Sequence, residues 1–563
     1  MKKIFGLTFL SLCILTGTVH AGEKEELIKL RNTTAKLLQL LVKEGVISGD
    51  RAQELVKEAS KEAAHQVAEE KADKMTNPQS KAEPGEVRIQ YVPQFVKDQI
   101  RQQVRAELRE DVSNDVLGKA KQERWGVPGV TPEWINRIKI NGDVRLRAQI
   151  DKFADGNAES EYIDYQKVNE EGSATGDVYQ NTTEDRRRLR ARARIGLKAK
   201  ITNDFTANIR LATGSGTDPV STNKTMGSYG NKYSILFDRA YLKFTDLDIN
   251  DYPWLTFYGG RMKNPFLSTD LVWDSDLAFD GLATTFRYNL SGSDNLFDMD
   301  DRRKTLYLTA GVFPLDEVEI SSDDKWMFGV QLGGKFISED SRSTYELGVA
   351  YYNYQNIIGR KNAVNGDLLN YTAPDFMQKG NTLYQISNDP LSPDKAPFAL
   401  ASDYNLINLT GRASFSHFAP TNIVVTADWV RNIGYDKQEI IDRTNGAVVV
   451  YGGRAGSIEN ITEEIDGYQI KVVVGWPQIT QRYSWRVFGA YKYLESDAVL
   501  DAFADSDFHL GGTNAKGFII GGEYGILDNV SLAARLLSAD QIAGGNSSPF
   551  GVDVFQLDLN VKF

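Results

Sequence analysis

The chain of 563 residues contains few cysteines and histidines. It has a single cysteine, Cys13, and four histidines. Disulfides, thiol chemistry and His/Cys metal centres are therefore not expected. The formal net charge of −11 also disfavours nucleic acid as a partner. We therefore predict no metal, no cofactor and no nucleic-acid partner.

Long apolar runs are also missing. After residue 21, no segment approaches the roughly 20 consecutive apolar residues that span a bilayer as a helix. The chain is nevertheless rich in Gly (48), Tyr (25) and Phe (26), which suits many β-strands. A membrane barrel escapes hydropathy analysis because only alternate residues of each strand face lipid. The lack of long apolar runs therefore argues against a helical membrane protein, and the composition allows a barrel.

The first 21 residues have the features of a secretion signal. Lys2 and Lys3 form a charged start, residues 4–15 form a short apolar run, and residues 19–21 form a small-residue cleavage site. Cys13 lies inside this segment and would be removed with it. The prediction is export into the envelope of a diderm bacterium, with a mature chain that contains no cysteine.

The next hundred residues have a helical composition. From Glu23 to about Lys121 the chain is charged, rich in Ala, Leu and Glu, and nearly free of aromatics. Leucines at helical spacing predict a helical hairpin or short coiled coil over 22–76, and Pro93 opens an amphipathic helix within a linker region, 77–130. We place this arm in the periplasm. It is either a solvated spacer or a coiled coil that helps a trimer assemble.

From Trp134 onward the hydrophobic period changes from 3.6 to 2. In residues 137–150, apolar side chains occupy one face, and charged or polar ones occupy the other. In residues 188–200, Arg188, Arg190, Arg192, Arg194, Lys198 and Lys200 alternate with Leu189, Ala191, Ala193, Ile195, Leu197 and Ala199. Such strands are long for a soluble sheet but match the ~9–11 residues of a tilted strand that crosses a bilayer.

The same alternation recurs to the end of the chain. Short links at 201–204, 338–342, 418–421 and 527–529 alternate with long links such as 151–185, 355–403 and 433–465, as periplasmic turns and external loops do in outer-membrane barrels. The link at 290–303 is long for a turn, so fourteen or eighteen strands also fit. We predict an all-β, antiparallel transmembrane barrel over 131–563 of about sixteen strands, near 136–150, 186–200, 204–213, 235–246, 254–262, 279–289, 304–313, 326–337, 343–354, 404–416, 421–432, 466–476, 483–494, 516–526, 529–538 and 552–563.

The last strand and the aromatic residues support a membrane location. Alternating apolar residues over 555–563 end on Phe563, which resembles the signal that the barrel-assembly machinery reads. Outer-membrane lipid and that machinery are therefore the expected partners. Aromatics near predicted strand ends fit interfacial girdles, namely Trp254, Trp273, Trp326, Trp429, Trp476, Trp485, Tyr351 and Tyr493.

Several stretches resemble the bacterial "putative porin" family. They are the helix hairpin at 40–48, Tyr91-Val92-Pro93, Trp125-Gly126-Val127-Pro128 leading to 141–147, the segment 259–266, and Phe279-Asp280-Gly281-Leu282. The resemblance spans nearly the whole chain. It implies an outer-membrane channel whose solute is generally unassigned, and it implies no catalytic residues.

If the apolar faces of the strands meet lipid, the charged faces line the lumen. So many like charges would repel one another in a dry core, which predicts a water-filled channel. A structural alternative pairs these bases with acids on neighbouring strands, such as Asp238 and Glu346. The candidate pore-lining bases are Arg137, Lys139, Arg145, Arg147, Arg188, Arg190, Arg192, Arg194, Lys198, Arg210 and Arg239.

The link over 263–278 carries three acids, Asp270, Asp274 and Asp276. By resemblance to general diffusion porins, we expect this loop to fold inward, so that its acids oppose the basic wall and narrow the pore. The alternative is an external loop whose acids are solvated.

These features predict passive diffusion of small hydrophilic solutes or ions, including a basic, anion-type variant. An outer-membrane enzyme such as a phospholipase is less favoured, because His417 and His509 lack a nearby nucleophile signature. A third hypothesis is an anchor or adhesin whose arm grips the cell wall. A Ca²⁺ site at Asp298, Asp300 and Asp301 lacks EF-hand spacing. A homotrimer is expected from barrel size and porin analogy.

Overall fold

The computed structural model describes residues 137–563, except 160–161, 173–177, 249–251, 291–303, 389–396, 446, 452–453, 457–460 and 544–549. The predicted signal peptide, helical arm and linker (1–21, 22–76 and 77–130) lie outside the described residues. Residues 291–303 also lie outside the described residues. They include most of the predicted link at 290–303 and the Ca²⁺ candidates Asp298, Asp300 and Asp301. The described residues belong to one compact unit, Val130–Phe563.

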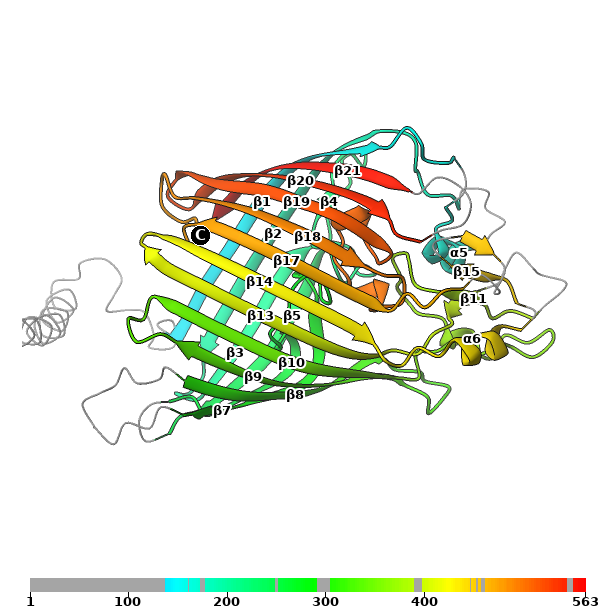
Figure 1. Ribbon diagram of the computed structural model, residues 1–563, viewed down its shortest axis with the longest axis horizontal. Coiled ribbons are helices and arrows are strands. Elements are labelled where there is room, and N and C mark those ends of the chain that lie inside the picture. The colour runs from blue at the N-terminus through cyan, green and yellow to red at the C-terminus, as the bar shows by residue number, and fades with distance from the viewer. Residues whose placement is uncertain are drawn as a thin grey trace, which may run out of the picture. The chain divides into compact units, whose positions relative to one another are not determined.

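One antiparallel sheet closes on itself to form a barrel (Figure 1). The first long strand, β1, pairs with β2 on one side and with the last strand, β21, on the other. The sheet has seventeen strands; one of them, β4 (Lys224–Thr225), is two residues long, and sixteen strands form the wall. They are β1 (Ile138–Phe153), β2 (Arg186–Lys200), β3 (Phe205–Thr213), β5 (Ile235–Asp246), β6 (Leu255–Lys263), β7 (Ala278–Asn289), β8 (Lys304–Asp316), β9 (Lys325–Ile337), β10 (Ser343–Gln355), β13 (Asn405–Phe418), β14 (Thr421–Asn432), β17 (Asp466–Gly475), β18 (Trp485–Leu494), β19 (Ala515–Leu527), β20 (Val530–Gln541) and β21 (Gly551–Lys562).

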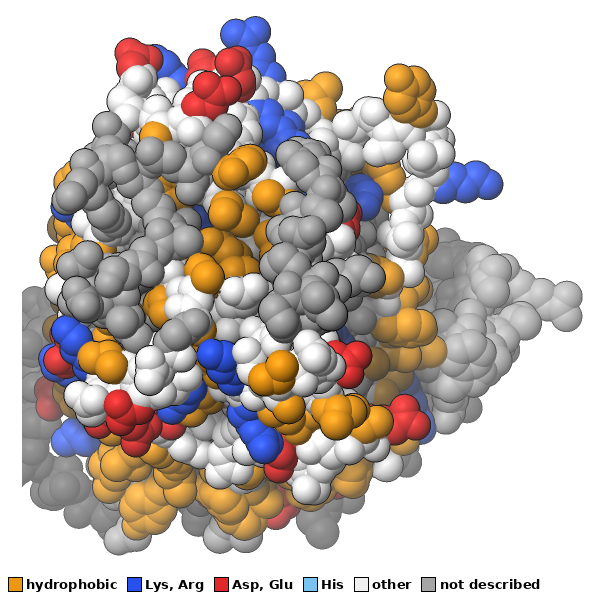
Figure 2. Space-filling view, turned by 90° about the vertical axis from the view of Figure 1, so that its right-hand side faces the viewer, with side chains coloured by type: hydrophobic (Ala, Val, Ile, Leu, Met, Phe, Trp, Pro, Cys, Tyr) orange, Lys and Arg blue, Asp and Glu red, His pale blue; other side chains and the backbone are white. Residues whose placement is uncertain are grey.

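The predicted strand count and period are confirmed. Along β2, Leu189 is 60% exposed and Ile195 is 51% exposed, whereas the arginines between them are half-buried. Along β9, Val330 and Leu332 are exposed, and Gln331 between them is fully buried. Successive side chains of a strand point to opposite faces, so these residues separate an apolar outer face from a polar inner face. Apolar side chains gather along the flank of the barrel in the end-on view (Figure 2).

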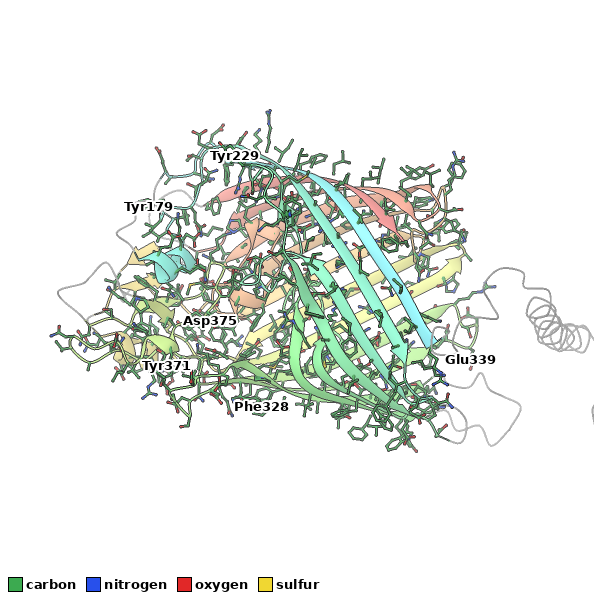
Figure 3. The ribbon with its side chains drawn as sticks, turned by 180° about the vertical axis from the view of Figure 1, so that it is seen from behind. Tyr179, Tyr229, Phe328, Glu339, Tyr371 and Asp375 are labelled. Carbon is green, nitrogen blue, oxygen red and sulfur yellow. The ribbon has the colours of Figure 1, made fainter. Side chains whose placement is uncertain are left out.

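Short and long connections lie at opposite ends of the barrel. The turn residue Glu339 is at one end, and the loop residues Tyr179 and Tyr371 are at the other, while Phe328 lies on the flank (Figure 3). This arrangement matches the predicted alternation of turns and loops. Within the described residues, no helix is both long enough and apolar enough to cross a membrane.

The long loops build small structures of their own. Two helices, α5 (Tyr165–Glu171) and α6 (Lys437–Thr444), start at Asp164 and Asp436, whose side chains accept hydrogen bonds from backbone N–H groups of the first turn. Tyr384, Ile386 and Ile440 contribute to a buried cluster. The other elements are a small sheet of β11 (Leu383–Gln385), β12 (Phe398–Leu400), β15 (Val449–Tyr451) and β16 (Arg454–Gly456), and short 3₁₀ segments η5 (Asn370–Thr372), η8 (Asp501–Phe503) and η9 (Phe508–Leu510).

One aromatic prediction is wrong. Trp273 was expected near a strand end at the membrane interface, yet it is 3% exposed and packs edge-on against Phe279 and Tyr352 in the main core cluster. The reason is that it lies on the loop between β6 and β7, which carries it into the core. In contrast, Trp429 and Trp485 are exposed, as an interfacial position requires.

Candidate lumenal site

The register of β1 and β2 aligns their basic residues in one ladder. Cα partners include Arg145 with Arg192 and Arg147 with Arg190. Asp143 on β1 accepts hydrogen bonds from Arg192 (2.8 Å) and Arg194 (2.8 Å). Asp143 therefore forms ion pairs with two of the predicted pore-lining arginines.

Arg147 is the most buried member of the ladder. Its guanidinium donates to both carboxylate oxygens of Asp558 on β21, at 2.7 and 2.9 Å. It also donates to Asp507, in the loop between β18 and β19, at 3.1 Å. A buried arginine held by two carboxylates is a structural contact that joins this part of the wall to the loop. Arg188 is paired more simply, with Asp151 at 2.6 Å.

Two members of the ladder carry charge that is only partly compensated. Arg190 makes no ion pair within the described part of the chain, and its guanidinium donates two long hydrogen bonds, to Gln149 Oε1 and Ser221 Oγ, both at 3.4 Å. Arg145 lies 3.8 Å from Asp558. The buried Nε atoms of Arg145 and Arg190 have no hydrogen-bond partner among the described residues. The wall therefore keeps an excess of positive charge at these two residues.

The remaining predicted bases lie outside the group of arginines that binds Asp143, Asp151 and Asp558. Arg210 on β3 forms an ion pair with Asp238 on β5, and Arg239 lies 4.0 Å from the same acid. This is the neighbouring-strand pairing that the sequence left as an alternative. The bases at the turn end of the ladder, Arg137, Lys139 and Lys198, make no ion pair with another described residue.

The loop between β6 and β7, residues 264–277, reaches across to distant strands. Gln331 on β9 accepts from the backbone N–H of Leu267 (2.7 Å) and donates to its carbonyl (2.8 Å). Asp428 on β14 accepts from the Thr269 hydroxyl at 2.6 Å. Since Gln331 and Asp428 are buried while their strand neighbours face outward, the loop lies against the inner face of the wall.

The three acids of this loop have different partners, and two of them, Asp270 and Asp276, contact side chains of the wall. Asp270 accepts from Gln469 on β17 at 2.7 Å, and although burial acts to raise its pKa, Lys492 and Lys471 lower it. Asp276 meets the arginine ladder through Arg194 at 3.0 Å. Burial acts to raise the pKa of Asp276, but the ladder arginines outweigh burial and lower it.

Asp274 forms no ion pair with another described residue. It accepts from the backbone N–H groups of Ser506 (2.9 Å) and Asp276 (2.7 Å). Burial and the neighbouring Asp505 raise the pKa of Asp274 to about 8. Of the three predicted acids, only Asp276 therefore contacts the predicted basic wall.

A second inward loop, residues 495–514 between β18 and β19, was missed by the sequence analysis. Its Asp507 accepts from Arg147 and from Arg535 on β20 (2.6 Å), and these arginines lower its pKa well below the usual value despite burial. Its Asp505 pairs with buried Lys492 at 3.0 Å. The acidic run of Asp501, Asp505 and Asp507 was the available signal, since it matches the pattern that singled out the first loop.

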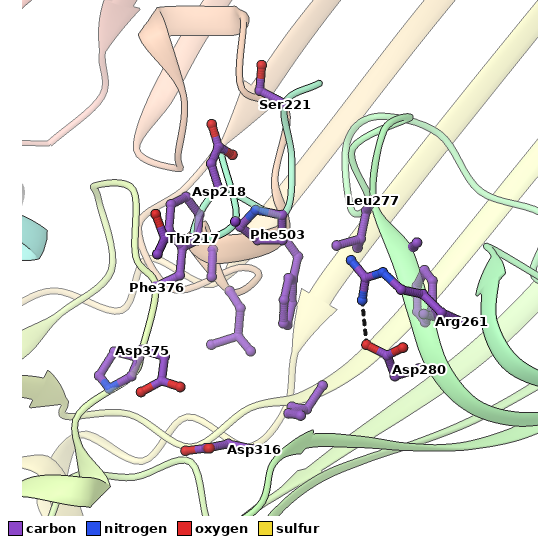
Figure 4. A pocket seen from close by; sticks show the side chains of 18 of the residues that line it. Thr217, Asp218, Ser221, Arg261, Leu277, Asp280, Asp316, Asp375, Phe376 and Phe503 are labelled. Atoms are coloured by element: carbon purple, nitrogen blue, oxygen red, sulfur yellow. Dashed lines mark hydrogen bonds and ion pairs between the residues drawn. The ribbon is translucent and has the colours of Figure 1, made fainter. Parts of the chain in front are cut away.

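The two inward loops leave a cavity of about 690 Å³ beside β5–β9 (Figure 4). Asp218, Asp280, Asp316 and Asp375 surround it, with Phe503 among them. Arg261 pairs with Asp280, and Lys325 pairs with Asp316 at 2.9 Å. The cavity therefore combines an aromatic lining with an acidic rim.

The two histidines considered for an enzyme, His417 and His509, contact an aspartate and a backbone carbonyl. His417 lies 3.5 Å from Asp340, and His509 bonds the backbone carbonyl of Phe550 at 3.0 Å. Burial and the nearby Lys379 lower the pKa of His509 to about 3. Among the described residues, no group of three or more His, Cys, Asp or Glu side chains has metal-binding geometry.

A closed antiparallel barrel of sixteen strands with an apolar outer face defines a transmembrane β-barrel of the bacterial outer membrane. The sequence profile of the family described as "Putative porin" matches residues 31–563. The chain therefore belongs to this porin family, and it is an outer-membrane channel protein.

Solved structures with a similar fold include the outer membrane channel DcaP of Acinetobacter baumannii (12% identity, 76% of this chain and 97% of that chain covered, TM-score 0.36). Another is OprB of Pseudomonas putida (11% identity, 78% and 97% covered, TM-score 0.41). A third is the trimer form of OmpT of Vibrio cholerae (10% identity, 76% and 99% covered, TM-score 0.36). No curated protein sequence matches the chain.

Proposed function

We propose that this protein is a diffusion channel that carries small hydrophilic solutes or ions through a water-filled lumen. The observation that carries the proposal is the division of the strands into an apolar outer face and an inner face that bears the arginine ladder. Charges of one sign on adjacent strands are tolerated beside water and counter-charges. Arg190, which makes no ion pair with another described residue, and Arg145, which lies 3.8 Å from Asp558, therefore favour a wet interior.

In this proposal the two inward loops determine the width of the pore and the electric field inside it. Asp276 brings a negative charge to Arg194, and Asp507 brings one to Arg147. Ion pairs that line a narrow passage orient the water beside them and select polar solutes. In this proposal the ladder lines the pore, and the loop over 264–277 forms its constriction.

The proposal includes the placement of the whole chain. The predicted helical arm lies in the periplasm, where it acts as a spacer or contacts the cell wall, and the barrels assemble as homotrimers. Support for the trimer comes from barrel size and from OmpT of Vibrio cholerae, which has a trimer form.

Liposome swelling tests the proposal. Purified protein in vesicles should admit neutral sugars at rates that fall steeply from mono- to trisaccharides, because a narrow passage sieves by size. Heat-induced shifts in gel mobility serve as the control that the barrel is folded. Folded protein that gives no swelling with any sugar would contradict a diffusion channel.

A further inference from the structure

The wall of the barrel is interrupted between β5 and β8 on the loop side. The pairing of β5 with β6 covers residues 240–246 of β5, and the pairing of β7 with β8 covers residues 305–312 of β8. Beyond these pairs, residues 235–239 of β5 lie beside β3 alone, and residues 313–316 of β8 lie beside β9 alone, among the described strands. The sheet therefore closes on the turn side but leaves a gap between β5 and β8 on the loop side.

The gap exists because β6 and β7 bend into the barrel at the same height. Gly260 and Gly281 are Cα partners, and their φ angles of +114° and +137° favour glycine. A Cβ atom at either position would overlap the backbone carbonyl oxygen of Ala240 or Val312, respectively. Beyond the bend, Met262 is fully buried. The two glycines therefore allow the ends of both strands to leave the wall and enter the core.

The free edges of β5 and β8 have features that suit an open edge. Pro314 lies on the edge of β8, and proline occurs in sheets mainly on edge strands because it has no N–H group. At the opposite edge, Arg261 Nε donates to the backbone carbonyl of Asp238 on β5 at 3.1 Å, and the same guanidinium pairs with Asp280. Open backbone at membrane depth is tolerated where it lines a cavity. The gap is therefore built into the fold.

The cavity of about 690 Å³ extends through this gap. Its lining includes Phe237, which is 68% exposed on the outer face of β5, and Pro314 on the outer face of β8. It also includes Phe313 and Met327, which are 1% exposed on the inner face. A cavity on one side of an intact sheet would contact the side chains of that face only. Because Pro314 pairs with Trp326, a predicted interfacial aromatic, the gap lies near the loop-side membrane interface.

The path from the gap to the inward loops is mostly apolar. Figure 4 shows Arg261 and Asp280 on one side of the cavity and Phe376 on the other. Burial of apolar surface is favourable, and cavities of this size hold small molecules. An uncharged aromatic or aliphatic molecule therefore fits this lining better than an ion does. The apolar lining residues include Trp273, Leu277, Phe279, Phe313, Phe376 and Phe503.

We propose that the gap is a side portal, through which small uncharged aromatic or aliphatic molecules pass between the cavity and the lipid of the outer leaflet. A molecule enters the cavity from the loop side, which is external in outer-membrane barrels. It packs on Phe376 and Phe503 and leaves past Phe237. The step into lipid is favourable because it removes apolar surface from water. The portal goes beyond the proposed function, since this route ends in the membrane and needs no continuous aqueous lumen.

Dye entry into intact cells tests the portal. The full-length chain is expressed in a host whose outer membrane excludes N-phenylnaphthalen-1-amine, an uncharged aromatic dye that fluoresces in hydrocarbon. Cells with the protein should gain fluorescence faster than cells with an empty vector. Release of a periplasmic enzyme should stay unchanged, which verifies that the membrane is intact.

The variants fill the cavity with a larger side chain. Ala278→Trp and Leu315→Trp both place an indole ring in the lining, and each should lose most of the gain in dye entry. Ala310→Trp is the matched control, because Ala310 lies where β8 is paired on both sides and does not line the cavity. The control should admit dye like the natural chain. Heat-dependent gel mobility verifies that each variant is folded.

A second measurement tests whether lipid reaches the gap. With Cys13 changed to Ser, Phe237→Cys carries a nitrobenzoxadiazole label in vesicles whose lipids are brominated on the acyl chains. The label should be strongly quenched, because position 237 lies at the outer edge of the gap. The same label on Asp375→Cys, within a loop that lines the cavity, should be quenched weakly. Equally weak quenching at both positions would place another protein surface, such as a second copy, over the gap and overturn the portal.

The outcomes separate the portal from the diffusion channel. Folded protein that admits dye no faster than the empty vector, or unchanged dye entry in both folded cavity variants, would overturn the portal. Protein that swells vesicles with sugars but admits no dye would overturn the portal and leave the channel standing. Protein that admits dye but gives no swelling would support the portal and contradict the diffusion channel.

Discussion

Arg147 shows how a single residue combines structural and lumenal roles. It joins β1 to β21, where the barrel closes, and to the inward loop that carries Asp507. An arginine in this position is expected to stabilise the barrel because it is the close cation of buried Asp558 and one of the two arginines that bind half-buried Asp507. The sequence grouped it with the other ladder arginines, since alternation alone does not distinguish a buried arginine from one beside water.

The first prediction concerns this residue. Arg147→Met should lower the free energy of unfolding by about 3–5 kcal/mol, because buried Asp558 loses its bidentate cation and Asp507 keeps only Arg535. Arg412→Met is the matched control; its side chain is exposed and lies 3.8 Å from Glu346, so the change should be below about 1 kcal/mol. Urea unfolding in lipid vesicles measures both. Equal losses for the two variants would refute the structural role of Arg147.

At the scale of elements, strand β2 carries the pattern on which the fold depends. Its register with β1 places Ile195 outward, and it places Arg194 inward against Asp143 and Asp276. A shift of one residue would exchange the two faces. The strand therefore offers adjacent positions with opposite environments.

Cysteine labelling tests this orientation directly. Cys13 is first changed to Ser, so that no other thiol is present. A membrane-impermeant maleimide should label Arg194→Cys and leave Ile195→Cys unlabelled in intact vesicles, and Ile195→Cys should be labelled only after the barrel is unfolded in denaturant, because maleimide reacts with the thiolate. The reverse pattern would place the arginine ladder toward lipid and refute the lumenal assignment.

Strand alternation allowed the strands to be predicted to within a few residues, because one face of each strand meets lipid. The loops were harder. An inward fold of residues 263–278 was expected by resemblance to general diffusion porins, but the anchors Gln331 and Asp428 could not be predicted, because they lie on distant strands. The loop over 495–514 was missed, because its contacts with Arg147 and Arg535 join residues that only barrel closure brings together.

At the scale of the whole molecule, three features act together. The wall is closed, its outer face is apolar, and two inward loops leave an acidic cavity beside a basic wall. A barrel of about sixteen strands is wide enough to hold water around such loops. The central claim is that ions pass through this interior.

Single-channel recording in planar lipid bilayers tests that claim most directly. Purified, folded protein should produce discrete current steps that are proportional to voltage and that scale with salt concentration. Insertion is verified independently by protease protection in vesicles of the same lipid. Folded and inserted protein that gives no current steps would contradict the water-filled channel.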